Sequence, residues 1–285
     1  MREAEARAGM FREETSVEVV NARHAGCTNP RIAEIVSALV RHLHAFVKDV
    51  QLTQEEWETA IGFLTRTGQL CSTERQEFIL LSDILGISML VDTINNRRPA
   101  GATENTVIGP FHLEDAPPRQ MGDSICLDGK GDTCLFEGRI LTMEGSPVAG
   151  ASIDVWSDNA EGFYDVQQPG IQPPGNNRGV FTTTADGRYS FLGIKPVSYP
   201  IPDDGPVGNL LKSLGRHPYR PAHMHFLIAA PGYEKLVTHI FVDGDNYLES
   251  DAVFGVKDSL IAKFNRSDSG RATWHCRFDF VLQEG

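Results

Sequence analysis

The sequence has few cysteines, and none of them is placed to form a paired site. The five cysteines of this 285-residue chain are widely separated, their number is odd, and no two have Cys-x-x-Cys spacing. This pattern indicates neither a disulfide framework nor a thiolate zinc site. We therefore expect reduced and chemically inert thiols.

Basic residues are outnumbered, and long hydrophobic runs are absent. There are 26 Lys and Arg against 38 Asp and Glu, a net charge of −12, and such a surface repels phosphate backbones and anionic lipid headgroups. No apolar run reaches the roughly 18 residues that cross a bilayer. The polar N-terminal segment lacks the apolar stretch of a secretory signal. We expect a soluble, cytoplasmic protein that binds neither nucleic acid nor a membrane.

The first part of the chain, from about residue 15 to residue 97, has helical periodicity. Asn29-Pro30 has the form of an N-cap followed by proline in the first turn, and apolar residues then recur three and four apart. Thr53 and Glu56 have the spacing of a capping box at the start of a second helix. These signals predict two amphipathic helices.

A third helix is predicted over residues 78–94. Thr73 and Gln76, just before it, again have capping-box spacing. The segment is apolar on nearly all sides, which a helix tolerates only where most of its surface is covered. We therefore expect this helix at the centre of the helical part or at a subunit interface.

Beyond about residue 98 the composition shifts to Gly, Pro and short runs of β-branched and aromatic residues. The turns Asp186-Gly187 and Asp243-Gly244 fit hairpins, and the proline-rich segment 196–221, with little strand pattern, is expected to be a functional loop. The spacing of the strands is typical of a β-sandwich or a partly closed barrel. The predicted strands are Leu135–Leu141, Ser152–Trp156, Val180–Thr184, Tyr189–Ile194, His223–Ala229, Val237–Val242 and Thr273–Val281.

We therefore expect a mainly β protein with an α-helical N-terminal part. The predicted boundary places a helical domain at residues 1–104 and a β-sandwich domain at residues 105–285. A fold class does not assign a function, so function has to be inferred from particular side chains.

The strongest local chemical signal is His223-Met224-His225. Residues i and i+2 of a strand point to the same face, so the two imidazoles would lie side by side as a metal chelate. A cupin would continue with Glu after three or four residues, where this chain has Ala229 and Ala230, and no HExxH or Cys pair supports a zinc hydrolase. The pair alone also fits two buried hydrogen-bonding groups, so both interpretations stay open.

Two tyrosines stand near these strands. Tyr164 follows the strand that ends at Trp156, and Tyr199 lies in the proline-rich segment. Either ring by itself is typical of a packed side chain with a satisfied hydroxyl.

Together these segments resemble the intradiol ring-cleaving dioxygenases of the catechol and hydroxyquinol branch. The resemblance covers nearly the whole chain, and the matching segments have the order and spacing of the family. They are residues 159–164, 199–203, 220–225, and 103–105 leading into 109–111.

The resemblance implies a non-haem ferric site in the sandwich domain, with one Fe(3+) per subunit held by Tyr164, Tyr199, His223 and His225. Two phenolates and two neutral imidazoles suit hard, trivalent iron. In the family an aromatic diol chelates the iron and displaces the tyrosine that matches Tyr199, whose phenolate can accept a substrate proton. The ring is then cleaved with O2 to a muconate without an external reductant.

Arg220 and His239 are further catalytic candidates. Arg220 matches an arginine that is taken to stabilise negative charge on the substrate ring and to orient it. Without the motif it would be interpreted as a structural arginine beside Pro221. His239 stands where many catechol-cleaving relatives carry Gln, and this departure leaves either a hydrogen-bonding role near the iron or a satisfied core histidine.

The resemblance also maps a substrate pocket. Catechol-cleaving members tend to have Pro and Leu at the positions of Asp83 and Phe111, whereas the hydroxyquinol branch resembles this chain. An acidic residue on an apolar helix could bond a third ring hydroxyl and would penalise substrates that lack one; internal pairing of Asp83 is the alternative. The pocket positions are Leu80, Asp83, Val107, Ile108, Gly109, Pro110, Phe111, Ile201, Pro202 and Val253.

We therefore expect benzene-1,2,4-triol as the substrate, cleaved to 3-hydroxy-cis,cis-muconate, the enol form of maleylacetate, with catechol or a chlorocatechol as the alternative. In relatives the N-terminal helices form a dimer interface, sometimes around a tunnel that holds a phospholipid. The resemblance thus implies a homodimer, a dimerisation role for residues 1–104, and phospholipid as a candidate partner.

A non-catalytic class competes with this interpretation. Residues 146–156 and 185–191 also resemble transthyretin-like sandwich modules, which bind sugars or space domains. Such modules have no reason to hold two tyrosines and a His-x-His in this order, so the dioxygenase interpretation is preferred.

Overall fold

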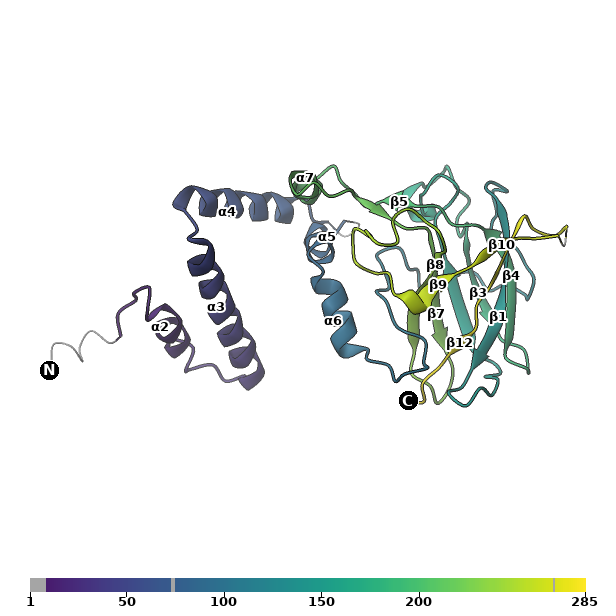
Figure 1. Cartoon of the computed structure of the whole chain (residues 1–285), viewed down its shortest axis with the longest axis horizontal. Coiled ribbons are helices and arrows are strands. Elements are labelled where there is room, and N and C mark those ends of the chain that lie inside the picture. Colours follow the sequence, from purple (N-terminus) through teal and green to yellow (C-terminus); the bar gives the residue numbers. More distant parts are fainter. Residues whose placement is uncertain (1–8, 73–74, 269) are drawn as a thin grey trace. The chain divides into compact units, whose positions relative to one another are not determined.

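The structure is a computed structural model that describes residues 9–72, 75–268 and 270–285 (Figure 1). The chain divides into two compact units, Met1–Arg66 and Thr67–Gly285. Helices precede a β-sandwich along the chain, which confirms the predicted fold class. The predicted domain boundary after residue 104 stays a prediction. Among the described residues, no helix is both long enough and apolar enough to cross a membrane.

The first unit is helical, and its helix starts confirm two predictions. The Asn29 side chain accepts a hydrogen bond from the backbone N–H of Arg31 at 3.0 Å and so caps its helix. Thr53 and Glu56 bond reciprocally, because the Thr53 N–H donates to the Glu56 carboxylate at 2.9 Å and the Glu56 N–H to the Thr53 hydroxyl at 3.2 Å. The helices that begin in this unit are α2 (Ser16–Ala22), α3 (Pro30–Val50) and α4 (Gln54–Gln69).

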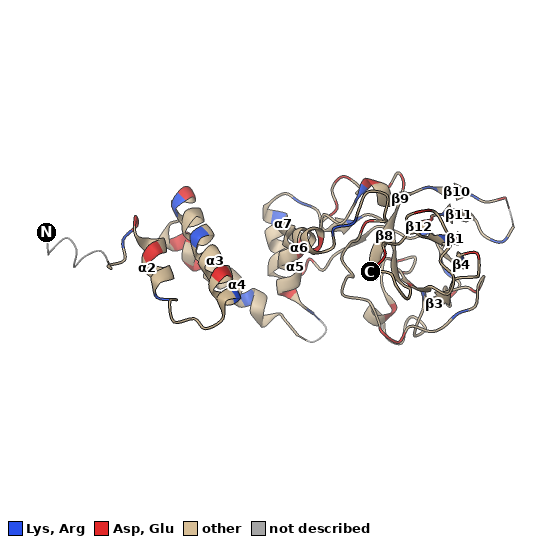
Figure 2. Ribbon diagram, turned by 90° about the horizontal axis from the view of Figure 1, so that it is seen from below, with Lys and Arg blue, Asp and Glu red and all other residues tan. Residues whose placement is uncertain are grey.

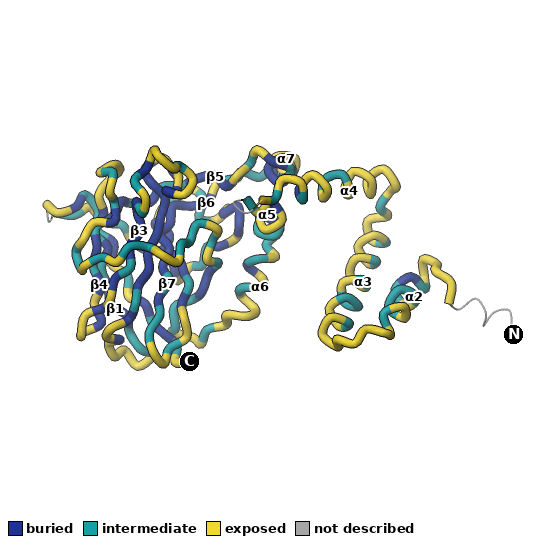
Figure 3. The backbone as a smooth tube through the Cα atoms, turned by 180° about the vertical axis from the view of Figure 1, so that it is seen from behind, coloured by how far each residue is buried: buried dark blue, intermediate teal, exposed yellow. Residues whose placement is uncertain are grey.

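One face of α3 is apolar and exposed (Figure 3). Charged residues of both signs lie on α3 and α4 (Figure 2). An apolar face of this extent is larger than a single chain usually leaves in water. Its members are Ile32, Ile35, Leu39, Leu43, Phe46, Val47 and Val50, each roughly half exposed.

Two helices, α5 (Glu77–Ile84) and α6 (Ile87–Asn95), replace the single helix predicted over residues 78–94. The prediction was wrong at Gly86, whose φ of 72° is left-handed and cannot continue a right-handed helix. Thr73, the predicted capping residue, lies outside the described residues. Exposed apolar side chains along this segment are Phe78, Ile79, Leu85, Ile87, Leu90, Val91 and Ile94.

The sandwich consists of two five-stranded sheets and a short additional ladder. The strands are β1 (Thr133–Leu141), β2 (Ser152–Trp156), β3 (Arg178–Thr182), β4 (Arg188–Ile194), β5 (Tyr199–Pro200), β6 (Tyr219–Arg220), β7 (His223–Ala229), β8 (Leu236–Val242), β9 (Ile261–Ala262), β10 (Phe264–Arg266), β11 (Trp274–Arg277) and β12 (Phe280–Val281). One sheet has the order β10-β11-β1-β12 with β4 paired to β1, the other has the order β3-β2-β7-β8-β9, and β5 pairs with β6. The remaining helical segments are α7 (Pro206–Ser213) and the 3-10 turns η1 (Asp165–Gln167) and η2 (Asp258–Leu260).

The hydrophobic core lies between the two sheets. Phe226 on β7 packs against Phe280 on β12, with 4.7 Å between the ring centroids. Met224 and Phe226 are fully buried in this core. Because side chains alternate along a strand, His223 and His225 lie on the opposite face of β7. The core thus fixes one face of β7 and leaves the other for the site.

Three features of the β region differ from prediction. Segment 196–221 contains β5, α7 and β6 rather than a loop alone. Thr273–Val281 is two strands, because Asp279 leaves the ladder and its carboxylate accepts a backbone hydrogen bond from β1 at 2.9 Å. The turns at Gly187 and Gly244 are not hairpins, since β3 and β4 belong to different sheets and β8 pairs with β9 in parallel.

Candidate active site

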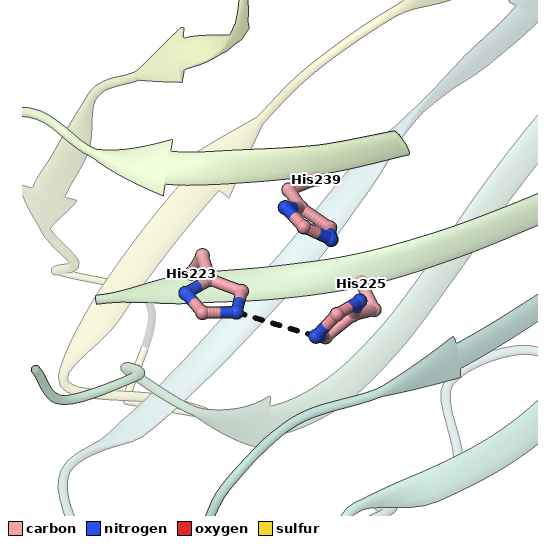
Figure 4. Close-up of side chains that lie close together, drawn as sticks. All are labelled: His223, His225 and His239. Atoms are coloured by element: carbon pink, nitrogen blue, oxygen red, sulfur yellow. Dashed lines mark hydrogen bonds between the residues drawn. The ribbon is translucent and has the colours of Figure 1, made fainter. Parts of the chain in front are cut away.

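Strand β7 presents two buried imidazoles on one face, as predicted. This strand is the middle one of its sheet. His225 lies directly opposite Trp156 of β2 on one side and His239 of β8 on the other. Figure 4 shows the imidazoles of His223, His225 and His239 gathered together, and each offers a ring nitrogen within 4.8 Å of the others.

A tight turn brings Tyr164 to this face. The side chain of Asn159 closes the turn by accepting two backbone hydrogen bonds at 3.0 Å. Gly162 has φ of 82°, and a Cβ there would lie 2.9 Å from the Cβ of Tyr199. Only glycine allows this close approach, so the turn and the segment of Tyr199 are packed directly together.

Tyr199 reaches the site from the two-residue strand β5. It lies directly opposite Arg220 of β6, so segment 196–221 delivers a phenol and a guanidinium side by side. The sequence identified both residues, but it did not reveal the ladder that pairs them.

The two phenols and two imidazoles form a continuous set of contacts. The Tyr199 and Tyr164 hydroxyl oxygens lie 3.4 Å apart. The Tyr164 hydroxyl lies 3.0 Å from Nε2 of His225, and that nitrogen lies 3.2 Å from Nε2 of His223. All four side chains are buried. The structure therefore brings together the four residues that the sequence identified as candidate ligands.

Burial sets the protonation of these four groups. It raises the pKa of the Tyr164 and Tyr199 hydroxyls, although the positive charge of Arg220 partly opposes this for Tyr199. Burial and the charge of Arg220 lower the pKa of His223 to about 3, and burial lowers that of His225 well below its ordinary value. The imidazoles are thus neutral near pH 7, and the phenols keep their protons unless a cation takes their place.

The donor set fits a metal ion. Nδ1 of His223 is 2.8 Å from the Pro221 carbonyl oxygen, to which it donates, so Nε2 carries the lone pair. Nδ1 of His225 has no hydrogen-bond partner among the described residues. Two imidazole nitrogens and two phenol oxygens that meet at one buried point suit a metal such as iron, which accepts both kinds of donor.

Arg220 lies at the edge of this set and is itself buried. Its Nη1 is 3.3 Å from Nε2 of His223. Its Nε lies 3.2 Å from the carboxylate of Asp251. Burial alone would lower the pKa of Arg220, but the charge of Asp251 more than offsets this and raises it. Arg220 therefore holds a permanent positive charge beside the candidate ligands.

His239 is fully buried, and neither of its ring nitrogens has a well-formed hydrogen bond among the described residues. Its ring centroid is 4.1 Å from that of His225. Burial and the neighbouring His223 lower its pKa well below the ordinary value. The backbone of Val107 is the hydrogen-bonding neighbour that acts on its ring, so both interpretations of His239, a hydrogen-bonding group near the iron and a satisfied core histidine, stay predictions.

Several predicted pocket residues lie at the site. Phe111 stacks on Tyr164 with 4.5 Å between centroids. Gly109 has φ of 75°, and a Cβ there would lie 3.2 Å from Cε1 of His225. The backbone of Val107 forms a hydrogen bond with His239, and the backbone N–H of Val253 donates to Asp251 at 3.2 Å. For these residues, and equally for Leu80, Ile108, Pro110, Ile201 and Pro202, a role in substrate binding stays a prediction.

Asp83 on α5 is partly buried and within electrostatic reach of Arg220. Burial raises the pKa of its carboxyl, while a hydrogen bond from Ser88 and the charge of Arg220 oppose the rise. Asp83 therefore has an internal partner, as one interpretation expected, and it also belongs to the charged groups around the site.

Three further side chains that the sequence did not indicate lie at the site. Trp156 stacks on His225 with 4.7 Å between centroids and an interplanar angle of 14°. His112 packs on Trp156 and lies 2.9 Å from the Asp154 carboxylate. Asp251 pairs with Arg220. Alternation along β2 could have placed Trp156, but no local pattern distinguishes Asp251 from other loop carboxylates.

Two family models match the chain, one over the helical part and one over the sandwich. Residues 108–284 match the family model described as Dioxygenase, and residues 29–103 match Catechol dioxygenase N terminus. The chain is 58% identical to a hydroxyquinol 1,2-dioxygenase of Rhizobium sp. (strain MTP-10005), over 96% of each chain. It is 52% identical to a 6-chlorohydroxyquinol 1,2-dioxygenase of Cupriavidus pinatubonensis, over 93% of this chain and 95% of the relative.

A solved structure has the same fold. The hydroxyquinol 1,2-dioxygenase from Pseudomonas putida DLL-E4 superposes with a TM-score of 0.92 at 46% identity, covering 96% of this chain and 99% of that one. The likeness extends over both the helical part and the sandwich.

Proposed function

Since this chain belongs to the intradiol ring-cleavage dioxygenases, we propose that it cleaves benzene-1,2,4-triol, also called hydroxyquinol, with O2. The bond between the two adjacent hydroxyl-bearing carbons is broken, and the product is 3-hydroxy-cis,cis-muconate, the enol form of maleylacetate. The observation that carries the proposal is the contact of two buried phenols with two neutral imidazoles beside Arg220.

The proposed cofactor is Fe(3+), one per subunit, held by Tyr164, Tyr199, His223 and His225. The iron dependence of the family and the oxygen and nitrogen donors support this assignment. When bound, ferric iron would supply a Lewis-acid centre to which the diol binds as a chelating ligand.

The chain's own residues provide the remaining functions. Tyr199, once its own proton has been displaced by the metal, would accept a proton from a substrate hydroxyl, and the charge of Arg220 opposite it partly offsets the rise in its pKa that burial causes. Arg220 stabilises the negative charge of the deprotonated ring. His239 places its imidazole at the same face, with its ring centroid 4.1 Å from that of His225. The aromatic wall of Phe111 and Trp156 keeps water from the reacting atoms.

Asp83 supports the triol as substrate. Its carboxyl lies on helix α5, among the charges around Arg220. A third ring hydroxyl can donate to this carboxyl, whereas catechol would leave it without that partner. The names of the relatives at 58% and 52% identity agree with this preference.

The proposal is tested by comparing triol and catechol on the iron-loaded enzyme. We expect a higher kcat/KM for the triol, and Asp83→Ala should lower the ratio of the two values about tenfold or more, as for loss of a hydrogen bond to a charged group. Asp92→Ala on the neighbouring helix is the matched control. Equal or better turnover of catechol by the unaltered enzyme would favour catechol or chlorocatechol cleavage. A protein that binds no iron would overturn the proposal.

We also propose that the chain forms a homodimer through residues 1–104, with residues 105–285 as the catalytic domain. The exposed apolar faces of α3 and of the segment from Phe78 to Ile94 support this. The same faces make a phospholipid a candidate partner, which mass spectrometry of a solvent extract would identify. Five cysteines without a disulfide accord with a cytoplasmic location.

A further inference from the structure

We infer that Asp251 is a positioning residue of the active site, which holds Arg220 by one edge so that the other edge faces the candidate ligands. The inference rests on the proposed function, because it concerns how Arg220 is presented to the substrate. Asp251 lies in the loop after β8 and is not one of the pocket positions that the sequence indicated.

The carboxylate of Asp251 is fully engaged. One oxygen is 3.2 Å from Nε of Arg220 and accepts the backbone N–H of Val253 at 3.2 Å. The other is 3.4 Å from Nη2 of Arg220 and accepts the backbone N–H of Gly255 at 2.8 Å. A side chain that is only 4% exposed and receives four N–H groups is held in one orientation.

The two edges of the Arg220 guanidinium therefore have different neighbours. Nε and Nη2 face Asp251, whereas Nη1 lies 3.3 Å from Nε2 of His223. The packing around the pair is close, since a Cβ on Gly255 would lie 2.9 Å from Nη2. The guanidinium therefore has little room to rotate, and Nη1 stays on the ligand side.

The same loop connects Arg220 to the proposed pocket. Val253 is held through the hydrogen bond of its N–H to Asp251. Asp83 lies within electrostatic reach of both Arg220 and Asp251. Asp251 is the buried counterion of Arg220, so Arg220 does not depend on Asp83 for charge neutralisation. The Asp83 carboxyl accepts a hydrogen bond from Ser88 and keeps further lone pairs for a substrate hydroxyl. Asp251 thus acts on the substrate through Arg220, without touching the substrate itself.

A surface cavity makes this role testable. Asp251 borders a cavity of about 460 Å³ that is open to solvent, together with Arg216, His217 and Phe254. Because Asp251 borders this cavity, we expect formate to enter Asp251→Ala from it and to take the place of the carboxylate beside Arg220. Asp251→Asn fills the same space with a neutral amide and leaves no room for formate.

We expect Asp251→Ala and Asp251→Asn to lower kcat/KM for the triol by about 10- to 100-fold, the range for partners that orient a functional group. The affinity for the triol without oxygen should fall too, while iron content and the visible band of the resting enzyme stay unchanged. Formate should restore Asp251→Ala at least partly and leave Asp251→Asn unrestored. Asp243→Asn, in an exposed turn, is the control.

Three outcomes would overturn the inference. The first is unchanged triol binding and turnover in both variants, and the second is an equal response of the two variants to formate. The third is a further loss of triol turnover when Asp251→Asn is added to Arg220→Gln. A residue that acts only through Arg220 has nothing left to position in that double variant. If Asp251→Ala does not fold, the Arg220→Gln series decides. Failure of the unaltered iron-loaded enzyme to cleave the triol would instead contradict the proposed function.

Discussion

The candidate metal ligands are buried polar side chains that lie mainly against each other. They are Tyr164, Tyr199, His223 and His225. Such groups are costly to bury unless a partner satisfies them. Their identity could be inferred from the sequence because the motif residues are distinctive and correctly ordered. The role of Asp251 could not be inferred from the sequence, because an ion pair between Arg220 and a carboxylate 31 positions away leaves no local sequence pattern.

Replacing Tyr164 by phenylalanine should remove one oxygen donor from the metal. We expect Tyr164→Phe to weaken metal binding about tenfold or more, with loss of activity, as measured by iron content after dialysis against a chelator. Tyr189→Phe is a matched control, because Tyr189 is equally buried and its hydroxyl donates to the Phe278 carbonyl in the core. Retention of iron by Tyr164→Phe would remove Tyr164 from the proposed ligands.

The metal-free protein should lose stability in acid. Burial lowers the pKa of His223 to about 3 and those of His225 and His239 well below 6.5. Between pH 6.5 and pH 3 the unfolded chain therefore binds more protons than the folded one, and the free energy of unfolding falls as the pH is lowered. The full contribution is present above pH 6.5.

Each of these histidines adds up to about 1.4 kcal/mol per pH unit to the slope of the free energy of unfolding against pH within that range. Urea denaturation of the metal-free protein at a series of pH values measures the slope. His239→Gln should reduce it by one histidine's share, and identical slopes for the two proteins would contradict the assignment of His239 as a neutral buried imidazole.

Strand β7 and helix α7 show which elements the sequence pattern could predict. Its bounds were predicted correctly because Met224 and Phe226 alternate with His223 and His225, so both faces have a clear pattern. Helix α7 was missed because prolines obscured the helical periodicity within segment 196–221. The local sequence pattern predicts a strand that packs on the core. It does not predict a short helix that is stabilised mainly by tertiary contacts.

The break between α5 and α6 can be tested by substitution. Gly86 has φ of 72°, and a Cβ there would lie 3.4 Å from the ring of Phe254. Gly86→Ala should destabilise the protein by about 1–2 kcal/mol, the usual cost of a left-handed conformation. Urea denaturation measures the change, with Gly26→Ala as the control because nothing lies within 4 Å of a Cβ at that position. An unchanged midpoint would argue against this conformation.

Two compact units with exposed apolar helical faces characterise the whole molecule. The sequence indicated a helical part and a sandwich, because their periodicities differ. It could not indicate which apolar faces the chain leaves exposed, since the same pattern describes a buried helix and an interface.

Self-association of the whole chain follows from these faces. We expect gel filtration to give a dimer mass that persists over about a hundredfold dilution. Leu39→Glu, on the apolar face of α3, should shift the mass toward the monomer, while Arg41→Glu on the same helix should not. A monomer mass for the unaltered chain at all concentrations would exclude the dimer.

The two halves of the candidate metal site belong to parts of the fold that open differently. His223 and His225 lie on the central strand of a sheet whose other face is the core, so their amide hydrogens should exchange with solvent only when the sandwich unfolds globally. Tyr164 follows a turn, and Tyr199 belongs to a two-residue strand, which are segments that open at lower free energy. Loading and loss of the metal should therefore proceed from the tyrosine side, at a rate set by local opening and not by global stability.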